Sequence, residues 1–261
     1  MLYFLYFVAF FLGASFGSFT LVIVNRLHVA SIINGRSKCL SCSKKLEWYE
    51  LVPVVSYLIQ KGRCTACNAK IGNDHVIVEI VYGFLFVLLY AFFLKDKGIN
   101  LTSTWWSIYY TAVFVVSGVL VLYDLRHRLV PEYFLYTFVG LSSIMMFIRL
   151  YTTGNIFELL TPLVISVPAY ILYLITKKKG IGLGDVVLFA GVGMLLGTEG
   201  AVAALVVSVW VAAIVGLLLQ MINKNTYHMK YALPFVPFII GATMLVLFTD
   251  ITVWTLVGLF S

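Results

Sequence analysis

The sequence predicts an all-α integral membrane protein with about eight transmembrane helices and one small soluble loop domain between the first two. Of its 261 residues, 62% are hydrophobic and only 11% are charged, and the mean hydropathy is +1.01. A soluble domain has about 25% charged residues, so this chain cannot bury its apolar surface in one core of its own. The second observation is a series of eight apolar runs separated by polar loops. Together they exclude a disordered chain and a soluble nucleic-acid-binding domain.

The apolar runs define the expected transmembrane helices, each of which needs about 20 residues, or about 30 Å of helix. The first, Leu2–Val24, is too long for a cleaved signal peptide and lacks its basic start, so we expect it to be retained. We divide the chain into a first transmembrane helix (1–25), a cytoplasmic loop (26–75) and a polytopic membrane domain (76–261). The later runs are Val76–Leu94, Trp105–Tyr123, Tyr133–Tyr151, Phe157–Thr176, Val186–Gly197, Ala201–Ile222 and Tyr231–Thr249.

The basic residues predict the orientation of these helices, because loops rich in Lys and Arg are retained in the cytoplasm. Alternate loops, those after runs one, three, five and seven, hold 15 of the 18 Lys and Arg residues. We therefore expect both termini outside the cell and the 26–75 loop in the cytoplasm. The +7 net charge is interpreted as a topology signal, with attraction to the anionic headgroups of the lipid bilayer as a second contribution. No nucleic-acid partner is expected.

All four cysteines lie in the 26–75 loop, as two C-x-x-C pairs: Cys39 with Cys42, and Cys64 with Cys67. This spacing is close to that of a zinc ribbon, in which four thiolates close a tetrahedral site. A loop of about 50 residues has too little apolar core to fold alone, and a metal ion would hold it together. The sequence therefore predicts structural Zn²⁺, with disulfides or free thiols as the alternative.

Two carboxylates stand out because they fall at the cytoplasmic edge of the membrane. Asp124 ends the third run, and Asp185 begins the short sixth run after the glycines Gly182 and Gly184. The two runs point in opposite directions, so both aspartates should reach the same face of the membrane. Two carboxylates that share a proton across a water molecule are the parts of an aspartic protease, and flanking glycines would let a substrate backbone approach. The alternative is that Asp124 caps the fourth run or pairs with Arg126, while Asp185 caps the sixth run.

Most other carboxylates are expected to be solvated. Glu47, Glu50 and Asp74 belong to the loop, and Glu158 falls near the outer end of a run, where water can reach it. Glu79 differs, because it would lie inside the second run, and an acidic side chain within the membrane is a functional candidate.

The order of the motifs resembles the type IV prepilin peptidase family, in its bacterial form with a four-cysteine cytoplasmic loop. The resemblance covers nearly the whole chain and rests on five segments in sequence order. They are Gly17-Ser18-Phe19 with Asn25-Arg26-Leu27; the Cys39 to Cys67 loop with Glu50-Leu-Val-Pro53-Val-Val-Ser56-Tyr57; Asp124-Leu125 with Val130-Pro131; Gly182-x-Gly184-Asp185; and Pro234-Phe235-x-Pro237-Phe238.

The resemblance implies an aspartic endopeptidase of the bacterial cell membrane, with Asp124 and Asp185 as its catalytic pair. It would remove the short basic leader from type IV prepilins and pilin-like precursors, after a glycine, at the cytoplasmic face. The resemblance also implies N-methylation of the new N-terminus with S-adenosylmethionine, for which Glu79 stands where the family has a glutamate tied to that activity. The alternative from another class is an ion- or proton-coupled transporter that uses the two aspartates.

Overall fold

The computed structural model describes residues 2–27, 35–39, 41–95, 101–176, 181–222, 233–249, 251–252 and 254–255. Several basic residues that predict the orientation, Lys177 to Lys179, Lys224 and Lys230, lie outside the described residues. Within the described residues the chain is helical, with two isolated β-bridges in the loop and no named strand. The expected all-α membrane fold is therefore confirmed.

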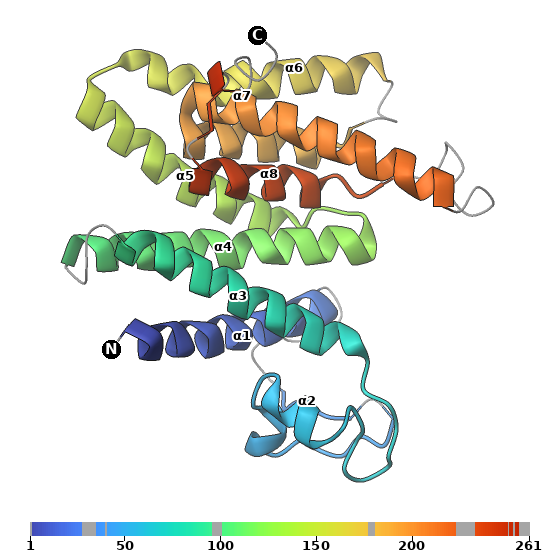
Figure 1. The fold of residues 1–261 in the computed structure, drawn as a ribbon. Coiled ribbons are helices and arrows are strands. Elements are labelled where there is room, and N and C mark those ends of the chain that lie inside the picture. The colour runs from blue at the N-terminus through green and yellow to red at the C-terminus, as the bar shows by residue number, and fades with distance from the viewer. Residues whose placement is uncertain are drawn as a thin grey trace. The chain divides into compact units, whose positions relative to one another are not determined.

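The chain forms two compact units, Met1–Val119 and Leu120–Ser261. The first contains the loop and the N-terminal helices, and helix α4 continues from it into the second (Figure 1). The elements, in order, are α1 (Leu2–Arg26), η1 (Trp48–Leu51), α2 (Val55–Ile59), α3 (Asn73–Lys95), α4 (Leu101–His127), α5 (Glu132–Thr153), η2 (Ile156–Leu160), α6 (Thr161–Ile175), α7 (Leu183–Ile222) and α8 (Val236–Thr249).

Six segments of the described chain are long and apolar enough to cross a membrane. They correspond to α1, α3, α4, α5, η2 with α6, and α7. The expected sixth and seventh spans both fall within α7, a 40-residue helix that leaves helical geometry at Gly197, where φ is 77° and ψ is 177°. Helix α8 has 14 residues, about 21 Å at about 1.5 Å per residue, which is shorter than a full span.

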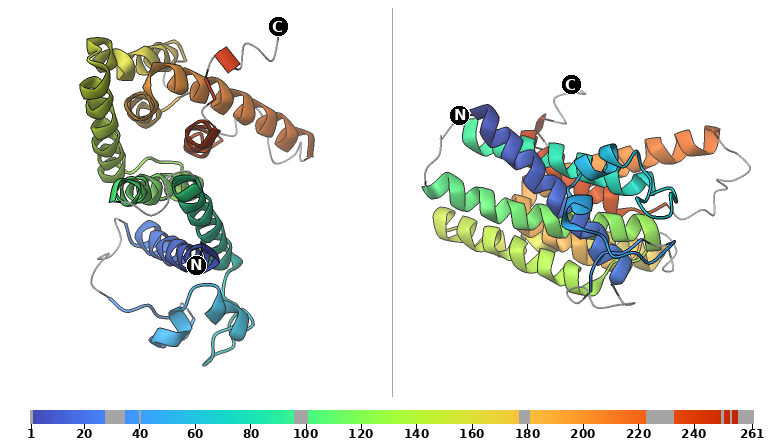
Figure 2. Two further views of the ribbon diagram at one scale, coloured as in Figure 1. Left: turned by 60° about the vertical axis from the view of Figure 1, so that its left-hand side comes forward. Right: turned by 90° about the horizontal axis from the view of Figure 1, so that it is seen from below.

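In the first unit, α1 and α3 pack side by side (Figures 1 and 2). Glycines of α1 allow this close approach. A Cβ atom at Gly13 would lie 2.5 Å from the backbone oxygen of Tyr82, and one at Gly17 would lie 3.0 Å from the backbone oxygen of Val78. Small residues of this kind let membrane helices approach each other closely.

In the second unit, Arg149 of α5 fixes the break in α7. Its Nη atoms donate hydrogen bonds of 2.8 and 2.6 Å to the backbone oxygens of Leu195 and Met194, which the break at Gly197 leaves without helical partners. Its Nε atom donates to Oε2 of Glu158 at 3.0 Å. The expectation that Glu158 is simply solvated is wrong, because its side chain is only 18% exposed and pairs with this arginine.

Candidate functional site

Asp124 lies in the last turn of α4, and its carboxylate is held by the start of another helix. The residue is buried, and its Oδ2 atom accepts a hydrogen bond of 3.1 Å from the backbone N–H of Val236, the first residue of α8. An amide at a helix start has no partner within its own helix, so a carboxylate is a favourable acceptor there.

Asp185 lies in the first turn of α7, and its carboxylate turns back to the glycine loop. Its Oδ2 atom accepts a hydrogen bond of 3.0 Å from the backbone N–H of Gly182, the residue before the helix. This is the reciprocal half of a capping box, in which an acidic side chain in the first turn binds the amide at the helix start. Each aspartate therefore accepts a hydrogen bond from an amide at a helix start, as the capping alternative expects. For Asp124, however, that helix is α8 and not the one that follows α4.

The loop between α4 and α5 packs closely against the glycine loop. A Cβ atom at Gly184 would lie 2.9 Å from both Cβ and Cγ2 of Val130, which is closer than side chains normally approach. A Cβ atom at Gly182 would come no closer than 3.4 Å to any neighbouring atom, the nearest being Oδ2 of Asp185. Val130 therefore requires a glycine at 184, and this contact places the α4–α5 loop, which follows Asp124, against the turn that carries Asp185.

The contact of Gly184 with Val130 brings together the helix ends that carry the two aspartates. The aspartates are separated by about 60 residues in the sequence, and both belong to the unit Leu120–Ser261. The aromatic rings of Phe189 in α7 and Phe235 before α8 approach to 6.1 Å between centroids, which joins the two segments that hold the carboxylates. The arrangement brings two helix ends with acidic side chains into a partly apolar setting within one unit.

Sequence reasoning missed the two groups that hold this pair in place, the Val236 amide and the Val130 side chain. For Val236 a signal was available. Val236 lies between Phe235 and Pro237. Pro237 has no N–H and is typical of the first turn of a helix, so the preceding Val236 amide is predicted to need an acceptor from outside the helix. For Val130 no signal was available, because the contact with Gly184 depends on how two distant loops pack.

The four cysteines come together at one point of the loop domain. All four are free thiols, and their Sγ atoms lie within 4.8 Å of one another. The Sγ atoms of Cys39 and Cys67 are 3.8 Å apart, and those of Cys42 and Cys64 are 3.9 Å apart. Zinc–sulfur bonds of about 2.3 Å place tetrahedral sulfurs about 3.8 Å apart, so the cluster has the dimensions of a four-thiolate metal site. The disulfide alternative does not fit these free thiols.

The two C-x-x-C segments adopt the same turn. The amide of Ser43 donates to the oxygen of Cys39, and that of Asn68 donates to the oxygen of Cys64, each at 3.0 Å. Ser43 and Asn68 share a left-handed conformation, with φ of 58° and 59°. The backbone N–H of Cys42 and then that of Ser41 lower the pKa of the Cys39 thiol to about 6, which favours the thiolate that binds metal.

Glu50 holds the two halves of the loop domain together. Its buried carboxylate accepts hydrogen bonds from the Thr65 hydroxyl and, at 2.9 Å, from the Lys44 ammonium group and the Glu47 amide. The Thr65 hydroxyl has the largest effect, followed by the Glu47 amide and Lys44, and together they lower the pKa of Glu50 to about 2. The expectation that Glu50 is a solvated acid is wrong.

Glu79 is buried in α3 and contacts the loop domain through the backbone. Its Oε2 atom accepts a hydrogen bond of 2.8 Å from the amide of Val54, which follows Pro53 and has a positive φ of 62°. A valine in this region of backbone space is strained, and an anionic acceptor at its amide stabilises that conformation. Glu79 thus fixes the segment between η1 and α2.

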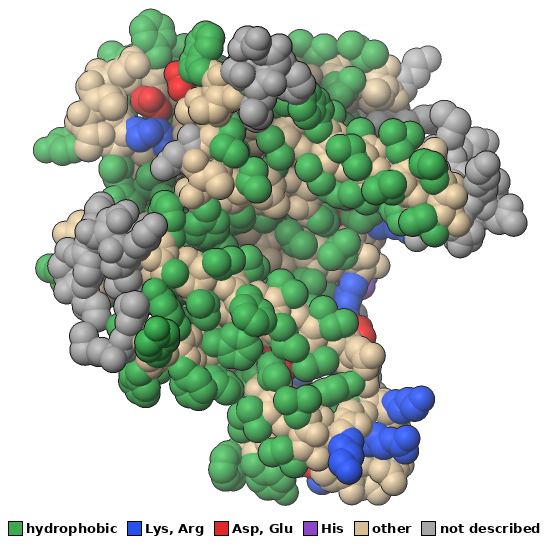
Figure 3. Space-filling model, viewed as in Figure 1, with side chains coloured by type: hydrophobic (Ala, Val, Ile, Leu, Met, Phe, Trp, Pro, Cys, Tyr) green, Lys and Arg blue, Asp and Glu red, His purple; other side chains and the backbone are tan. Residues whose placement is uncertain are grey.

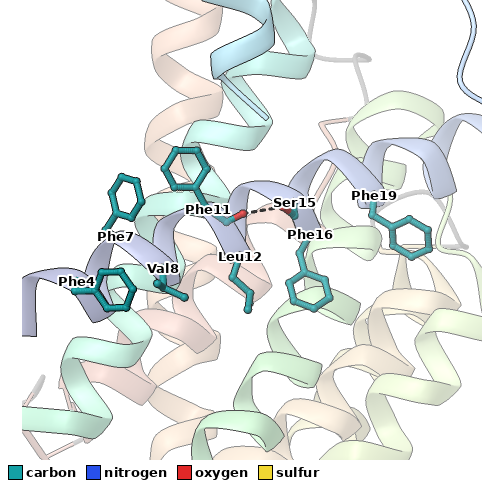
Figure 4. Close-up of a pocket in the computed structure, with 8 residues that line it drawn as sticks. All are labelled: Phe4, Phe7, Val8, Phe11, Leu12, Ser15, Phe16 and Phe19. Atoms are coloured by element: carbon teal, nitrogen blue, oxygen red, sulfur yellow. Dashed lines mark hydrogen bonds between the residues drawn. The ribbon is translucent and has the colours of Figure 1, made fainter. Parts of the chain in front are cut away.

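A shallow hollow of about 620 Å³ lies along α1, away from these groups (Figure 4). Its walls are apolar apart from Ser15, whose hydroxyl donates to the backbone oxygen of Phe11. The lining offers no acid, base or metal ligand, as is typical of a face that contacts lipid chains. The residues that line it are Phe4, Phe7, Val8, Phe11, Leu12, Ser15, Phe16 and Phe19.

The fold and these sites define the class of the protein: a multi-pass helical membrane protein with a carboxylate pair and a four-thiol loop that could bind a metal. Comparison with known proteins identifies the family. Residues 11–93 match the Bacterial Peptidase A24 N-terminal domain, and residues 110–218 match the Type IV leader peptidase family. The chain belongs to the type IV prepilin peptidase family, which confirms the resemblance noted in the sequence.

Curated relatives carry the same description. The chain is 28% identical over 197 residues to a prepilin leader peptidase/N-methyltransferase of Vibrio cholerae, covering 70% of this chain and 74% of that protein. It is 29% identical over 244 residues to one of Bacillus subtilis, covering 91% and 92%, and 26% identical over 217 residues to one of Pseudomonas aeruginosa, covering 80% and 70%. No solved structure matches the chain.

Proposed function

We propose that this protein is a membrane aspartic endopeptidase in which Asp124 and Asp185 are the catalytic pair. The observation that carries the proposal is the pairing of two acidic groups from distant helix ends, each anchored through Oδ2 to a backbone amide. Membership of a peptidase family supports this proposal. No specific observation in the described residues favours the transporter alternative. The proposal assigns both residues a part in one reaction rather than two separate capping roles.

In the proposed reaction, the pair holds one proton and one water molecule. The ionised carboxylate removes a proton from the water while its oxygen attacks the scissile carbonyl carbon, and the protonated carboxyl donates its proton to the carbonyl oxygen. As the tetrahedral intermediate collapses, the C–N bond breaks, the leaving nitrogen takes a proton from one carboxyl of the pair, and a hydroxyl of the intermediate returns its proton to the other carboxylate, so that the pair again holds one proton. The amides of Val236 and Gly182 hold the Oδ2 atoms, which leaves Oδ1 of each aspartate to face water and substrate.

We propose that the substrates are type IV prepilins and pilin-like precursors. The names of the relatives support this class. The cut would follow a glycine, where the short basic leader meets the apolar helix of the precursor. The excess of Lys and Arg in alternate loops supports a multi-pass orientation with both termini outside and the aspartates at the cytoplasmic face. At that face the precursor helix can stay in the bilayer while its leader junction reaches the pair.

The test is cleavage of a purified prepilin by the detergent-solubilised protein. Asp124→Asn and Asp185→Asn should each lower the cleavage rate by about a thousandfold or more, because each removes a proton-transfer group. Asp74→Asn, in the first turn of α3, is the matched control and should retain the wild-type rate. Retained activity in either catalytic variant would overturn the two-aspartate mechanism.

For the four-cysteine cluster, we propose structural Zn²⁺ bound by Cys39, Cys42, Cys64 and Cys67. Four thiolates leave no coordination position for water or substrate, so the ion would fold the loop rather than react. The dimensions of the cluster support this assignment.

We also propose N-methylation of the new N-terminus, an activity named in the relatives. S-adenosylmethionine would supply the methyl group. The contribution of Glu79 would be to hold the Val54 amide, and thus the segment between η1 and α2, in its strained conformation. Glu79→Gln, which can still accept a hydrogen bond, should keep more methylation than Glu79→Ala, while leader cleavage continues in both. Mass spectrometry of the processed N-terminus measures cleavage and methylation together, and equal methylation in all three proteins would refute this role.

A further inference from the structure

One side of the loop domain exposes large apolar side chains. Trp48, Tyr49 and Leu51 of η1 are 77%, 55% and 45% exposed, and Leu58 and Ile59 of α2 are 66% and 75% exposed. We call these five residues the apolar ledge. Figure 3 shows hydrophobic side chains gathered on the side of this domain nearer the start of α1. An exposed apolar patch on an otherwise polar domain indicates a contact surface.

The opposite side of the same domain is basic. Between residues 35 and 75 the chain has seven Lys and Arg residues against three Asp and Glu residues. One of the three acids, Glu50, is buried against Lys44 and does not offset the surface charge. Figure 3 shows the Lys and Arg side chains at the edge of the domain away from the hydrophobic ones. The exposed basic residues are Arg36, Lys38, Lys45, Lys61, Arg63 and Lys70.

Two hydrogen bonds hold the segment that carries the ledge beside the start of a candidate membrane span. Helices α1 and α3 are membrane spans, and the loop domain connects the end of one to the start of the other. Glu79, which binds the Val54 amide, lies six residues into α3, about 9 Å along the helix axis. The Tyr57 hydroxyl donates a hydrogen bond of 2.7 Å to Oδ1 of Asn73, at the start of α3. Helix α2 is therefore anchored beside the first turns of a membrane helix rather than held away from it.

We propose that the apolar ledge inserts into the headgroup region of a lipid bilayer, with the basic side of the same domain turned away from the bilayer. Trp and Tyr are favoured at this depth of a membrane, and an apolar face opposite a basic face is the pattern of an interfacial segment. Because the hydrogen bonds to Glu79 and Asn73 hold α2 beside the first turns of a membrane helix, lipid is the occupant within reach of the ledge. Insertion would hold the metal-binding loop against the membrane.

Trp48 is a natural probe of this contact, and the full-length protein can be tested in vesicles. The protein has five tryptophans, so the emission of Trp48 is the difference between wild type and Trp48→Phe. In phosphatidylcholine vesicles containing phosphatidylglycerol, lipids brominated on their acyl chains should quench the Trp48 component at least about twofold, as expected at the interfacial depth. Acrylamide in the water should quench it only weakly.

Two double variants separate insertion from general lipid contact. Leu58→Ser with Ile59→Ser should expose Trp48 to acrylamide. The matched control, Ile156→Ser with Phe157→Ser, alters a similarly exposed pair in η2 and should leave Trp48 protected. Size-exclusion profiles in detergent check that both variants fold.

Three outcomes would overturn the proposal. The first is a Trp48 component that acrylamide quenches freely and brominated lipid does not. The second is protection that appears only when a prepilin is added, which would make the ledge a substrate surface. The third is protection that rises with the protein-to-lipid ratio, which would make it a contact between two copies of the chain.

Discussion

Replacement of Gly184 by alanine should sharply reduce peptidase activity while leaving the protein folded. The new Cβ atom would lie 2.9 Å from Cβ and Cγ2 of Val130, whereas carbon atoms in contact are normally about 3.5–4.0 Å apart. The two loops must therefore separate by about 0.6–1.1 Å. Val130 precedes Pro131, which restricts its backbone, so the turn that carries Asp185 must give way.

The expected magnitude follows from this displacement. Overpacking of a tight contact costs about 1–3 kcal/mol, which a helical membrane domain can tolerate. A catalytic group misplaced by about 1 Å can lower the rate by about a hundredfold. Because Gly184 does not have a positive φ, alanine itself is allowed there, and the effect comes from the contact alone.

The assay is the kcat and KM for prepilin cleavage, with thermal unfolding measured on the same samples. Gly182→Ala is the matched comparison, because its Cβ atom would come no closer than an ordinary 3.4 Å to any neighbouring atom, and it should lose only a few-fold in kcat. Gly140→Ala, with nothing within 4 Å, is the neutral control. Val130→Ala should partly restore the Gly184→Ala variant by removing one of the two close atoms. Wild-type kcat in Gly184→Ala, or an equal loss in Gly182→Ala, would refute the reasoning.

Three further predictions concern stability. Arg149→Met should lower the melting temperature of the membrane domain, because it leaves two backbone oxygens of α7 and Glu158 without this donor, and each such charged hydrogen bond contributes about 1.5–3 kcal/mol. The pKa of Glu50 is lowered to about 2 in the folded loop. Its stabilisation of the loop is therefore complete at pH values above its ordinary pKa of 4.5 and is lost as the pH falls from 4.5 towards 2. Proteolysis of wild type and Glu50→Gln should therefore differ at neutral pH and converge in acid. Chelation of the metal, or Cys64→Ser, should release about one zinc per chain and make the loop sensitive to protease, which elemental analysis and digestion would show.

The sequence predicts the parts of this protein that follow from residue type and spacing. The meeting of the four cysteines is predicted by two C-x-x-C pairs in one short loop, because each pair can contribute two sulfurs to one ion. The opposite directions of the two runs predict that Asp124 and Asp185 lie near each other, and the contact between Gly184 and Val130 agrees with this prediction. The catalytic assignment itself stays a prediction.

The parts that could not be predicted depend on contacts between distant segments. Glu50 looks like a solvated acid in the sequence, and only the folding of the second C-x-x-C turn brings Thr65 to it. Glu158 lies near the end of an apolar run, so the sequence predicts a solvated carboxylate, and only the packing of α5 brings Arg149 beside it. The kink at Gly197 divides α7 between the two expected runs, but the sequence does not show that Arg149 binds the backbone oxygens of Met194 and Leu195 just before it.

The location of these groups argues that the two activities of the family are separable in this chain. Both aspartates, and the Val236, Gly182 and Val130 groups that hold them, belong to the unit Leu120–Ser261. The cysteine cluster, Glu79 and the apolar ledge belong to the unit Met1–Val119. The hydrogen bonds named for the aspartates all lie within the second unit, so loss of the proposed zinc should reduce the proposed methylation before it reduces cleavage. Loss of both in parallel would mean that the loop is needed to present the precursor to the aspartates.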